Sequence, residues 1–206
     1  MKNPIFKNVL VLSPHTDDGE LGAGGTIARL VENGSYVTYY AFSAPKVRLK
    51  NECKKSLAVL GVSDFKIFDI QVRIFPKLRQ EILDILYAFN QETEIDLVLT
   101  PSTNDLHQDH QTVTNEALRI FKDSTILGYE LPWNLIVFRE SCFIPLQDHH
   151  VEKKIQALWN YQSQIETKKQ YFNKEYLESL MRSRGLKINR AYAEAFEAIK
   201  VVFKSF

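Results

Sequence analysis

The chain has 206 residues, enough for one domain with a modest extension. Apolar residues make up 45% of it and aromatic residues 12%, which supplies a packed core and excludes a disordered or fibrous protein. The formal net charge is only +1, so no basic excess points to nucleic acid or to an anionic membrane as a partner.

Neither a membrane span nor a secretory leader is visible in the sequence. No run approaches the roughly 20 apolar residues that a spanning helix needs, and the apolar run near the N-terminus ends at Pro14. Cys53 and Cys142 form no Cys-x-x-Cys pattern, so we expect two reduced thiols. The prediction is a cytoplasmic protein whose partner is a small molecule, and a homo-oligomer stays open.

The first half of the chain alternates strand patterns with helix patterns. Short apolar or β-branched runs predict four strands, at 9–12, 36–42, 65–70 and 96–100. Apolar residues at helical spacing predict three helices between them, at 26–33, 50–60 and 78–89. This alternation is typical of a mainly parallel sheet whose right-handed crossovers place helices on both faces.

The pattern changes beyond residue 124. Strands are predicted at 126–131 and 135–144, helices at 151–161 and 174–182, and a helix followed by a strand in the tail, 192–206. We therefore predict a single domain, 1–206. It consists of a three-layer α/β/α half with a mainly parallel sheet, 1–124, and a C-terminal β/helical extension, 125–206.

A polar segment follows the first predicted strand directly. His15, Asp17, Asp18 and Glu20 place one imidazole and three carboxylates within six residues. His15 and Asp18 are three apart, so one turn can direct both at the same point, and both are ordinary zinc ligands. The alternative is an acidic N-terminal cap on the next helix. A cap explains one or two carboxylates but not the histidine beside them.

A second polar segment, 101–111, follows the fourth predicted strand. His107 and His110 lie three apart with Asp109 between them, in what we expect to be a loop. Asp109 can orient a ligating imidazole as a second-shell residue or cap a helix. The remaining histidines, His149 and His150, are expected to be solvated loop residues.

Taken together, the two segments predict a metal site. Both follow strands of the same sheet, at the edge where open α/β sheets bind their ligands. Two histidines and one carboxylate with a fourth position left open are a ligand set of catalytic zinc sites.

These residues resemble the PIG-L/LmbE-like zinc-dependent N-deacetylases, which have a Rossmann-like fold. The resemblance rests on the run from Pro14 to Asp18 and on His107 to His110, which are similar to the His-Pro-Asp-Asp-Glu and His-x-Asp-His motifs of that family. Further similar segments are Gly24–Gly25, Gly128–Glu130, Tyr161–Gln164, Arg184–Gly185 and Tyr192–Phe196. The chain departs from the family at Thr16, usually proline, and at Gly19, often glutamate.

The resemblance implies a function and a role for each residue. His15, Asp18 and His110 would hold Zn²⁺, and Asp17 would be the general base. His107 would stabilise the oxyanion or protonate the leaving amine. The substrate would be an N-acetylated amino sugar, an N-acetylglucosamine-type conjugate or glycan precursor, whose acetamide is hydrolysed to acetate and a free amine.

Substrate-binding residues are less constrained by the sequence. A guanidinium suits a phosphate or carboxylate on the substrate. Five arginines are candidates for that contact, none preferred over the others: Arg48, Arg73, Arg182, Arg184 and Arg190.

Two other functions stay open at this point. The Asp17–Asp18 pair could hold Mg²⁺ in a sugar or phosphoryl transferase, although Mg²⁺ favours oxygen ligands over histidines. A non-catalytic sugar- or nucleotide-binding module could use Gly22–Gly25 for phosphate, although this run lacks the spacing of either common fingerprint.

Overall fold

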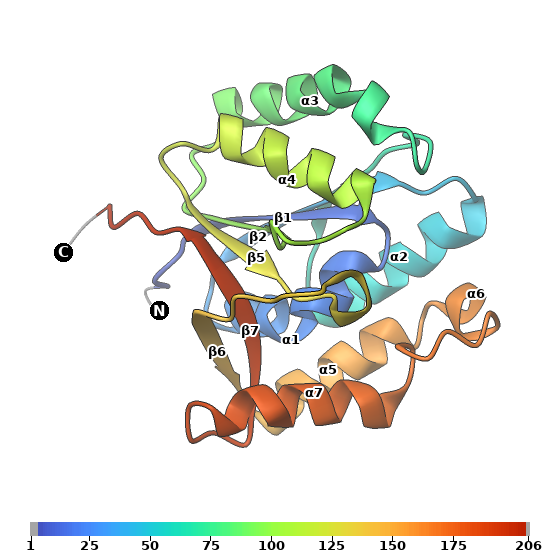
Figure 1. Ribbon diagram of the computed structural model, residues 1–206, viewed down its shortest axis with the longest axis vertical. Helices are drawn as coiled ribbons and strands as arrows, with labels where there is room; N and C mark the ends of the chain where they lie inside the picture. The colour runs from blue at the N-terminus through green and yellow to red at the C-terminus, as the bar shows by residue number, and fades with distance from the viewer. Residues whose placement is uncertain (1–3, 205–206) are drawn as a thin grey trace.

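The computed structural model describes residues 4–204 and has one mixed sheet between two layers of helices (Figure 1). The strands are β1 (Asn8–His15), β2 (Tyr36–Ser43), β3 (Asp64–Ile67), β4 (Leu97–Pro101), β5 (Thr125–Tyr129), β6 (Cys142–Leu146) and β7 (Tyr192–Lys200). The α-helices are α1 (Asp18–Glu32), α2 (Val47–Leu60), α3 (Arg79–Glu92), α4 (Gln108–Ile120), α5 (Asp148–Leu158), α6 (Gln162–Ile165) and α7 (Lys174–Leu186). Short 3₁₀ helices are η1 (Phe75–Lys77) and η2 (Pro132–Asn134).

The strand order is β3-β2-β1-β4-β5-β7-β6. The five strands from β3 to β5 are parallel, and β7 pairs antiparallel with both β5 and β6. The predicted fold class is confirmed, and the strands of the C-terminal extension join the same sheet. From β1 the chain adds β2 and β3 on one side, and it then returns to add β4 and β5 on the other side of β1. The point between β1 and β4, where this order reverses, is where such folds bind ligands.

Each face of the sheet carries its own hydrophobic cluster, because side chains alternate along a strand. Val9 and Val11 of β1 pack with the helix layer that contains α1, α2 and α5. Leu10 and Leu12, which point the other way, pack with α3 and α4. Figure 1 shows these two helix layers on opposite sides of the sheet, as the right-handed crossovers require.

The tail prediction is wrong. Residues 192–200 form strand β7, although the run of Ala and Glu favours a helix. Pairing on both edges, with β5 and β6, overrides that local preference. Residues 201–204 continue without regular structure, and the end of the predicted last strand lies outside the described residues.

The largest of the other differences from the predictions concern β6, α4 and α1. The strand predicted at 135–144 is reduced to β6, which begins only at Cys142. Helix α4 was not predicted, so the second polar segment is a loop only as far as His107, and residues 108–111 are the first turn of α4. Helix α1 begins at Asp18, eight residues before its predicted start, and has a non-helical residue, Ala23, inside it.

Glu194 of β7 explains how α1 tolerates that break. Its carboxylate accepts hydrogen bonds from the amides of Gly25 (3.0 Å) and Thr26 (2.6 Å), which cap the second half of the helix. The same carboxylate contacts the ammonium of Lys154 at 2.6 Å, and both side chains are buried. Lys154 also donates to the carbonyl of Leu21. This buried pair joins β7 and α5 to the helix that carries the first polar segment.

The structure also bears on the state of the two cysteines and on the presence of a membrane-spanning helix. Cys53 and Cys142 are both free thiols, as predicted. Among residues 4–204, no helix is long and apolar enough to cross a membrane.

We predict that Glu194→Ala lowers the free energy of unfolding by about 3–5 kcal/mol, because it leaves a buried ammonium and two helix amides without their acceptor. Urea denaturation measures the change. The control is Glu178→Ala, which removes one partner of the more exposed Lys174–Glu178 pair and should cost less than about 1 kcal/mol. Equal effects of the two substitutions would contradict this role of Glu194.

Candidate metal centre and active site

The two polar segments meet at one edge of the sheet. His15 is the last residue of β1, and His107 is the N-cap of α4, the helix that follows β4. Because β1 and β4 are parallel neighbours, their carboxyl ends lie side by side at the point where the strand order reverses. Local structure therefore places both segments where the sheet topology favours a ligand.

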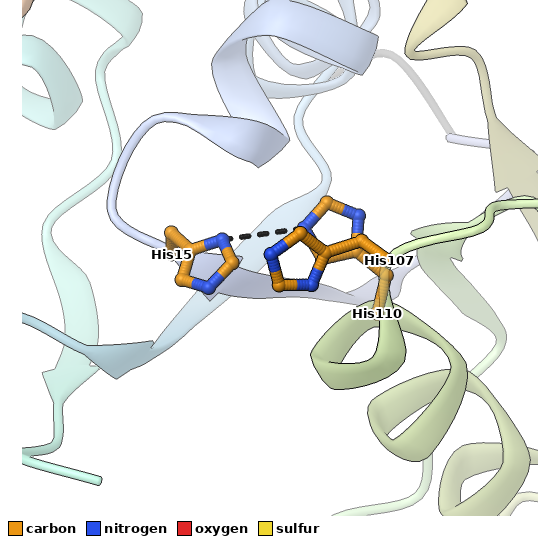
Figure 2. A group of neighbouring side chains, drawn as sticks. All are labelled: His15, His107 and His110. Atoms are coloured by element: carbon orange, nitrogen blue, oxygen red, sulfur yellow. Dashed lines mark hydrogen bonds between the residues drawn. The ribbon is translucent and has the colours of Figure 1, made fainter. Parts of the chain in front are cut away.

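Three potential ligand atoms converge there. The Nδ1 atom of His15 lies 3.0 Å from Oδ2 of Asp18 and 3.2 Å from Nε2 of His110, and Nε2 of His110 lies 3.2 Å from Oδ2 of Asp18. Figure 2 shows the two imidazoles directed at each other from the end of β1 and the start of α4. Bonds of about 2.0–2.1 Å to one ion put its ligand atoms about 2.9 Å apart in an octahedron and about 3.3 Å apart in a tetrahedron. The observed spacings fall in this interval, so the donor set fits one ion.

The far nitrogen of each imidazole is bound to a buried aspartate. His15 Nε2 lies 3.2 Å from Oδ2 of Asp109, and His110 Nδ1 lies 2.7 Å from Oδ2 of Asp105. Such contacts fix the ring orientation and leave the inner nitrogen free to bind a metal. Asp109 was singled out from the sequence, whereas Asp105 was missed. Its place just before the histidine pair, in the turn that enters α4, is the signal that could have indicated it.

His107 stands close to these rings but is arranged differently. Its ring centroid lies 4.9 Å from that of His15 and 4.5 Å from that of His110, so the three histidines form a group that could hold a metal ion. However, His107 Nδ1 accepts the backbone N–H of Asp109. In the neutral ring Nε2 then carries the proton and is a donor. This arrangement suits a hydrogen bond to substrate better than a metal bond.

The charges of the site favour a cation at its centre. Burial disfavours a charged His15, but Asp18 and Asp109 outweigh burial and raise the pKa of His15 to about 9. Burial likewise opposes a charge on His110, and Asp18 and Asp105 raise its pKa to about 10. Although burial works against it, the two histidines hold the pKa of Asp18 well below its usual range.

Asp17 and a buried hydroxyl line the pocket beside this centre. The pocket has a volume of about 320 Å³, at the lower end for small-molecule sites. Burial and the neighbouring charge of Asp18 raise the pKa of Asp17 to about 6. Ser43 also lines the pocket, and its buried Oγ has no hydrogen-bond partner among the described residues.

Glu20 and the glycine run lie away from the pocket. Glu20 is fully buried and accepts hydrogen bonds from Tyr39, Tyr161 and Ser56. A Cβ on Gly22 would lie 2.3 Å from the ring of Tyr129, one on Gly25 2.5 Å from Leu146, and one on Gly24 3.0 Å from Lys154. These glycines are therefore required by packing inside the domain, and the run loses its value as a phosphate-binding signal.

A second cluster of possible ligands lies between α1 and α5. Glu32 contacts His149 at 2.8 Å and His150 at 2.5 Å. Nδ1 of His150 accepts the N–H of Gln147, so the neutral ring donates its Nε2 proton to Glu32 and offers no lone pair to a metal. His149 and His150 both lie in the first turn of α5, and His150 is buried, which corrects their assignment to a solvated loop.

Comparison with known proteins places this site in a family. Residues 10–121, more than half of the chain, match the family model PIG-L, described as GlcNAc-PI de-N-acetylase. The chain therefore belongs to the PIG-L family and to the hydrolytic N-deacetylases that define it. The matched range contains both polar segments.

Individual relatives are distant but cover nearly the whole chain. The diacetylchitobiose deacetylase of Thermococcus kodakarensis is 24% identical over 96% of this chain and 85% of its own length. The solved N,N'-diacetylchitobiose deacetylase of Pyrococcus horikoshii superposes with a TM-score of 0.74, at 21% identity, over 95% of this chain and 85% of the other. A 4-carboxy-2-hydroxymuconate hydratase of Pseudomonas putida KT2440, GalB, has a TM-score of 0.76, at 18% identity, over 97% of this chain and 99% of its own. Proteins named for different reactions, a deacetylase and a hydratase, thus share this fold.

We predict that Asp109→Asn loosens the loop before η1. Asp109 also accepts the amides of Arg73 (2.6 Å) and Phe75 (3.3 Å), and an amide side chain cannot accept from all of these donors. Hydrogen exchange at the Arg73 amide should accelerate about 10–100-fold, the loss expected for one charge-assisted hydrogen bond. Asp123→Asn, in the turn beyond the C-terminal end of α4, is the control. Unchanged exchange at Arg73 would show that Asp109 does not hold this loop.

Proposed function

We propose that the chain hydrolyses the acetamide of an N-acetylated amino sugar, with a divalent metal, zinc, held by His15, Asp18 and His110. The observation that carries this proposal is the set of three donor atoms spaced 3.0–3.2 Å apart, from residues that line one pocket. Two imidazole nitrogens and one carboxylate leave a fourth coordination position free for substrate or water. Relatives named as deacetylases of acetylated sugars support the substrate class.

Bound zinc would polarise the acetamide carbonyl and favour ionisation of the attacking water. Asp17 is the group placed to take the proton from that water. Its carboxylate lines the pocket next to Asp18, and a pKa of about 6 leaves it ionised, yet basic, near neutral pH. The proton that Asp17 accepts can then pass to the amine nitrogen as the C–N bond breaks.

His107 supplies a hydrogen bond and not a proton. Burial and the neighbouring His110 and His15 lower its pKa, which favours the neutral ring. Its Nε2–H can donate to the carbonyl oxygen as negative charge develops there, a contact whose loss typically costs about 10²–10³ in rate. In this scheme Asp17 returns the proton to the leaving amine, and His107 acts as the hydrogen-bond donor to the oxyanion.

The donor set and the pocket argue against the alternatives. Two imidazole nitrogens among three ligand atoms suit zinc better than Mg²⁺, which favours oxygen. A phosphate-binding module loses its only sequence signal, because Gly22–Gly25 is buried against side chains. A hydratase remains the rival that the fold itself allows, and acetate release separates the two reactions.

The test of the proposed roles is Asp17→Asn. The variant should retain stoichiometric zinc and lose at least about 10²-fold in acetate release from an N-acetylglucosamine conjugate, because an amide cannot take the proton. Metal content and acetate are measured on the same preparation.

His110→Ala is the companion variant and should lose both zinc and activity. His149→Ala, in the second histidine cluster, should lose neither. Turnover by Asp17→Asn at the parental rate would contradict its role as the base, and full zinc content in His110→Ala would contradict the ligand set.

A further inference from the structure

The structure separates the five arginines that could bind an anionic part of the substrate. Arg48 is paired with Glu52 and Glu166, and Arg184 is paired with Glu130 and Glu140. The remaining three arginines have no ion pair among the described residues. The guanidinium of Arg182 lies over the ring of Tyr192, that of Arg190 donates to the carbonyl of Asn189, and Arg73 lines the pocket of the metal centre.

The backbone of Arg73 is fixed at the pocket by hydrogen bonds, and its guanidinium is unpaired among the described residues. It has a φ of 70°, a left-handed conformation that is uncommon for a residue other than glycine and that is found at functional sites when the surroundings enforce it. Asp109 accepts its amide and Gln108 donates to its carbonyl, which fixes that conformation. Within residues 4–204 its guanidinium forms no hydrogen bond or ion pair.

Lys169 adds a second cation to the same pocket, from the loop between α6 and α7. Its ammonium donates to Gln164 Oε1 at 2.7 Å and lies 5.4 Å from the ring centre of Tyr171. Burial opposes its charge, but Tyr171 and the nearby Asp17 and Asp18 outweigh burial and raise the pKa of Lys169. It is half-buried and charged, and among the described residues it forms no ion pair.

The pocket wall beside Lys169 is a stacked aromatic pair. Tyr171 stacks on Trp133 with ring centres 3.9 Å apart and planes 11° from parallel, and both residues line the pocket. Lys169 rests on the Tyr171 ring, so the ammonium is held at the pocket by the cation–π contact and by Gln164. Little side-chain entropy would be lost when an anion binds it.

We propose that Arg73 and Lys169 together bind an anionic substituent, a phosphate or a carboxylate, on the N-acetylated amino sugar. The inference rests on the proposed function and narrows its substrate class. The pocket lining has two acidic residues, Asp17 and Asp18, and two basic ones, Arg73 and Lys169, so a bound dication would add two positive charges to a balanced lining. Asp105 and Asp109 lie behind the imidazoles and are bound to them. With a neutral sugar bound, Arg73 and Lys169 would have no ion-pair partner, whereas an anionic substituent supplies one.

The experiment compares matched ligands that differ in charge. The zinc-loaded protein carrying Asp17→Asn, which prevents turnover from disturbing the titration, is titrated calorimetrically with four ligands. These are methyl N-acetylglucosaminide, N-acetylglucosamine 1-phosphate, N-acetylglucosamine 6-phosphate and N-acetylglucosaminuronic acid. At least one anionic ligand should bind about 10–100-fold more tightly than the neutral glycoside. The phosphates and the uronic acid distinguish the two kinds of anion.

Arg73→Gln and Lys169→Gln should each remove most of that preference and leave binding of the neutral glycoside within about threefold. Lys168→Gln removes a charge from the neighbouring residue, which does not line the pocket, and should change neither. In the zinc-loaded parent the same substitutions should lower kcat/KM for the anionic substrate through KM.

Three results would overturn the proposal. The first is that no anionic ligand binds better than the neutral glycoside. The second is that the preference survives in the double variant, because the metal would then bind the anion directly. The third is that Lys169→Gln lowers kcat equally for neutral and anionic substrates, because Lys169 would then serve Asp17 and not the substrate. Failure of the proposed function is distinct: the parent would release no acetate from any of the four compounds, while the binding titration would still decide the anion site.

Discussion

The constraint on which the site depends is the convergence of three lone-pair atoms within 3.2 Å of one another. His15 Nδ1, His110 Nε2 and Asp18 Oδ2 cannot share this space unless positive charge lies between them, because their lone pairs repel and burial removes the screening of water. Protons on the two imidazoles satisfy that need in the absence of a metal, and a single divalent ion satisfies it better. Asp105 and Asp109 complete the arrangement, since they fix both rings from behind.

The fold brings these atoms together through its strand order. β1 and β4 are far apart in sequence but adjacent in the sheet, so the residues that follow them share one edge. Asp18 stands on the first turn of α1, whose second half is capped by Glu194 of the C-terminal strand. The last quarter of the chain thus supports a helix that begins at the candidate metal centre, and it also contributes Lys169 and Tyr171 to the pocket lining. The extension is part of the site and not an appendage to it.

Much of this arrangement could be predicted from the sequence, for physical reasons that also explain the errors. The apolar runs of the buried strands and the clustering of His15, Asp18 and His110 after two of them are local signals, and the sheet topology makes them meet. The tail could not be predicted, because Ala and Glu favour a helix and only pairing with β5 and β6 makes it a strand. The role of the glycine run could not be predicted either, because it depends on residues distant in sequence: Tyr129 fills the space that a Cβ on Gly22 would need. The choice of Arg73 among five arginines likewise depends on ion pairs between distant residues.

The central claim is that one metal ion is held by two imidazoles and one carboxylate, one from α4 and two from the junction of β1 and α1. Anomalous diffraction at the zinc absorption edge, from crystals of the zinc-loaded protein, tests it most directly. The account predicts one strong peak about 2.0–2.2 Å from His15 Nδ1, His110 Nε2 and a carboxylate oxygen of Asp18, with the fourth position open to the pocket. A peak bound by His107 in place of Asp18, or one located only at Glu32, His149 and His150, would contradict it.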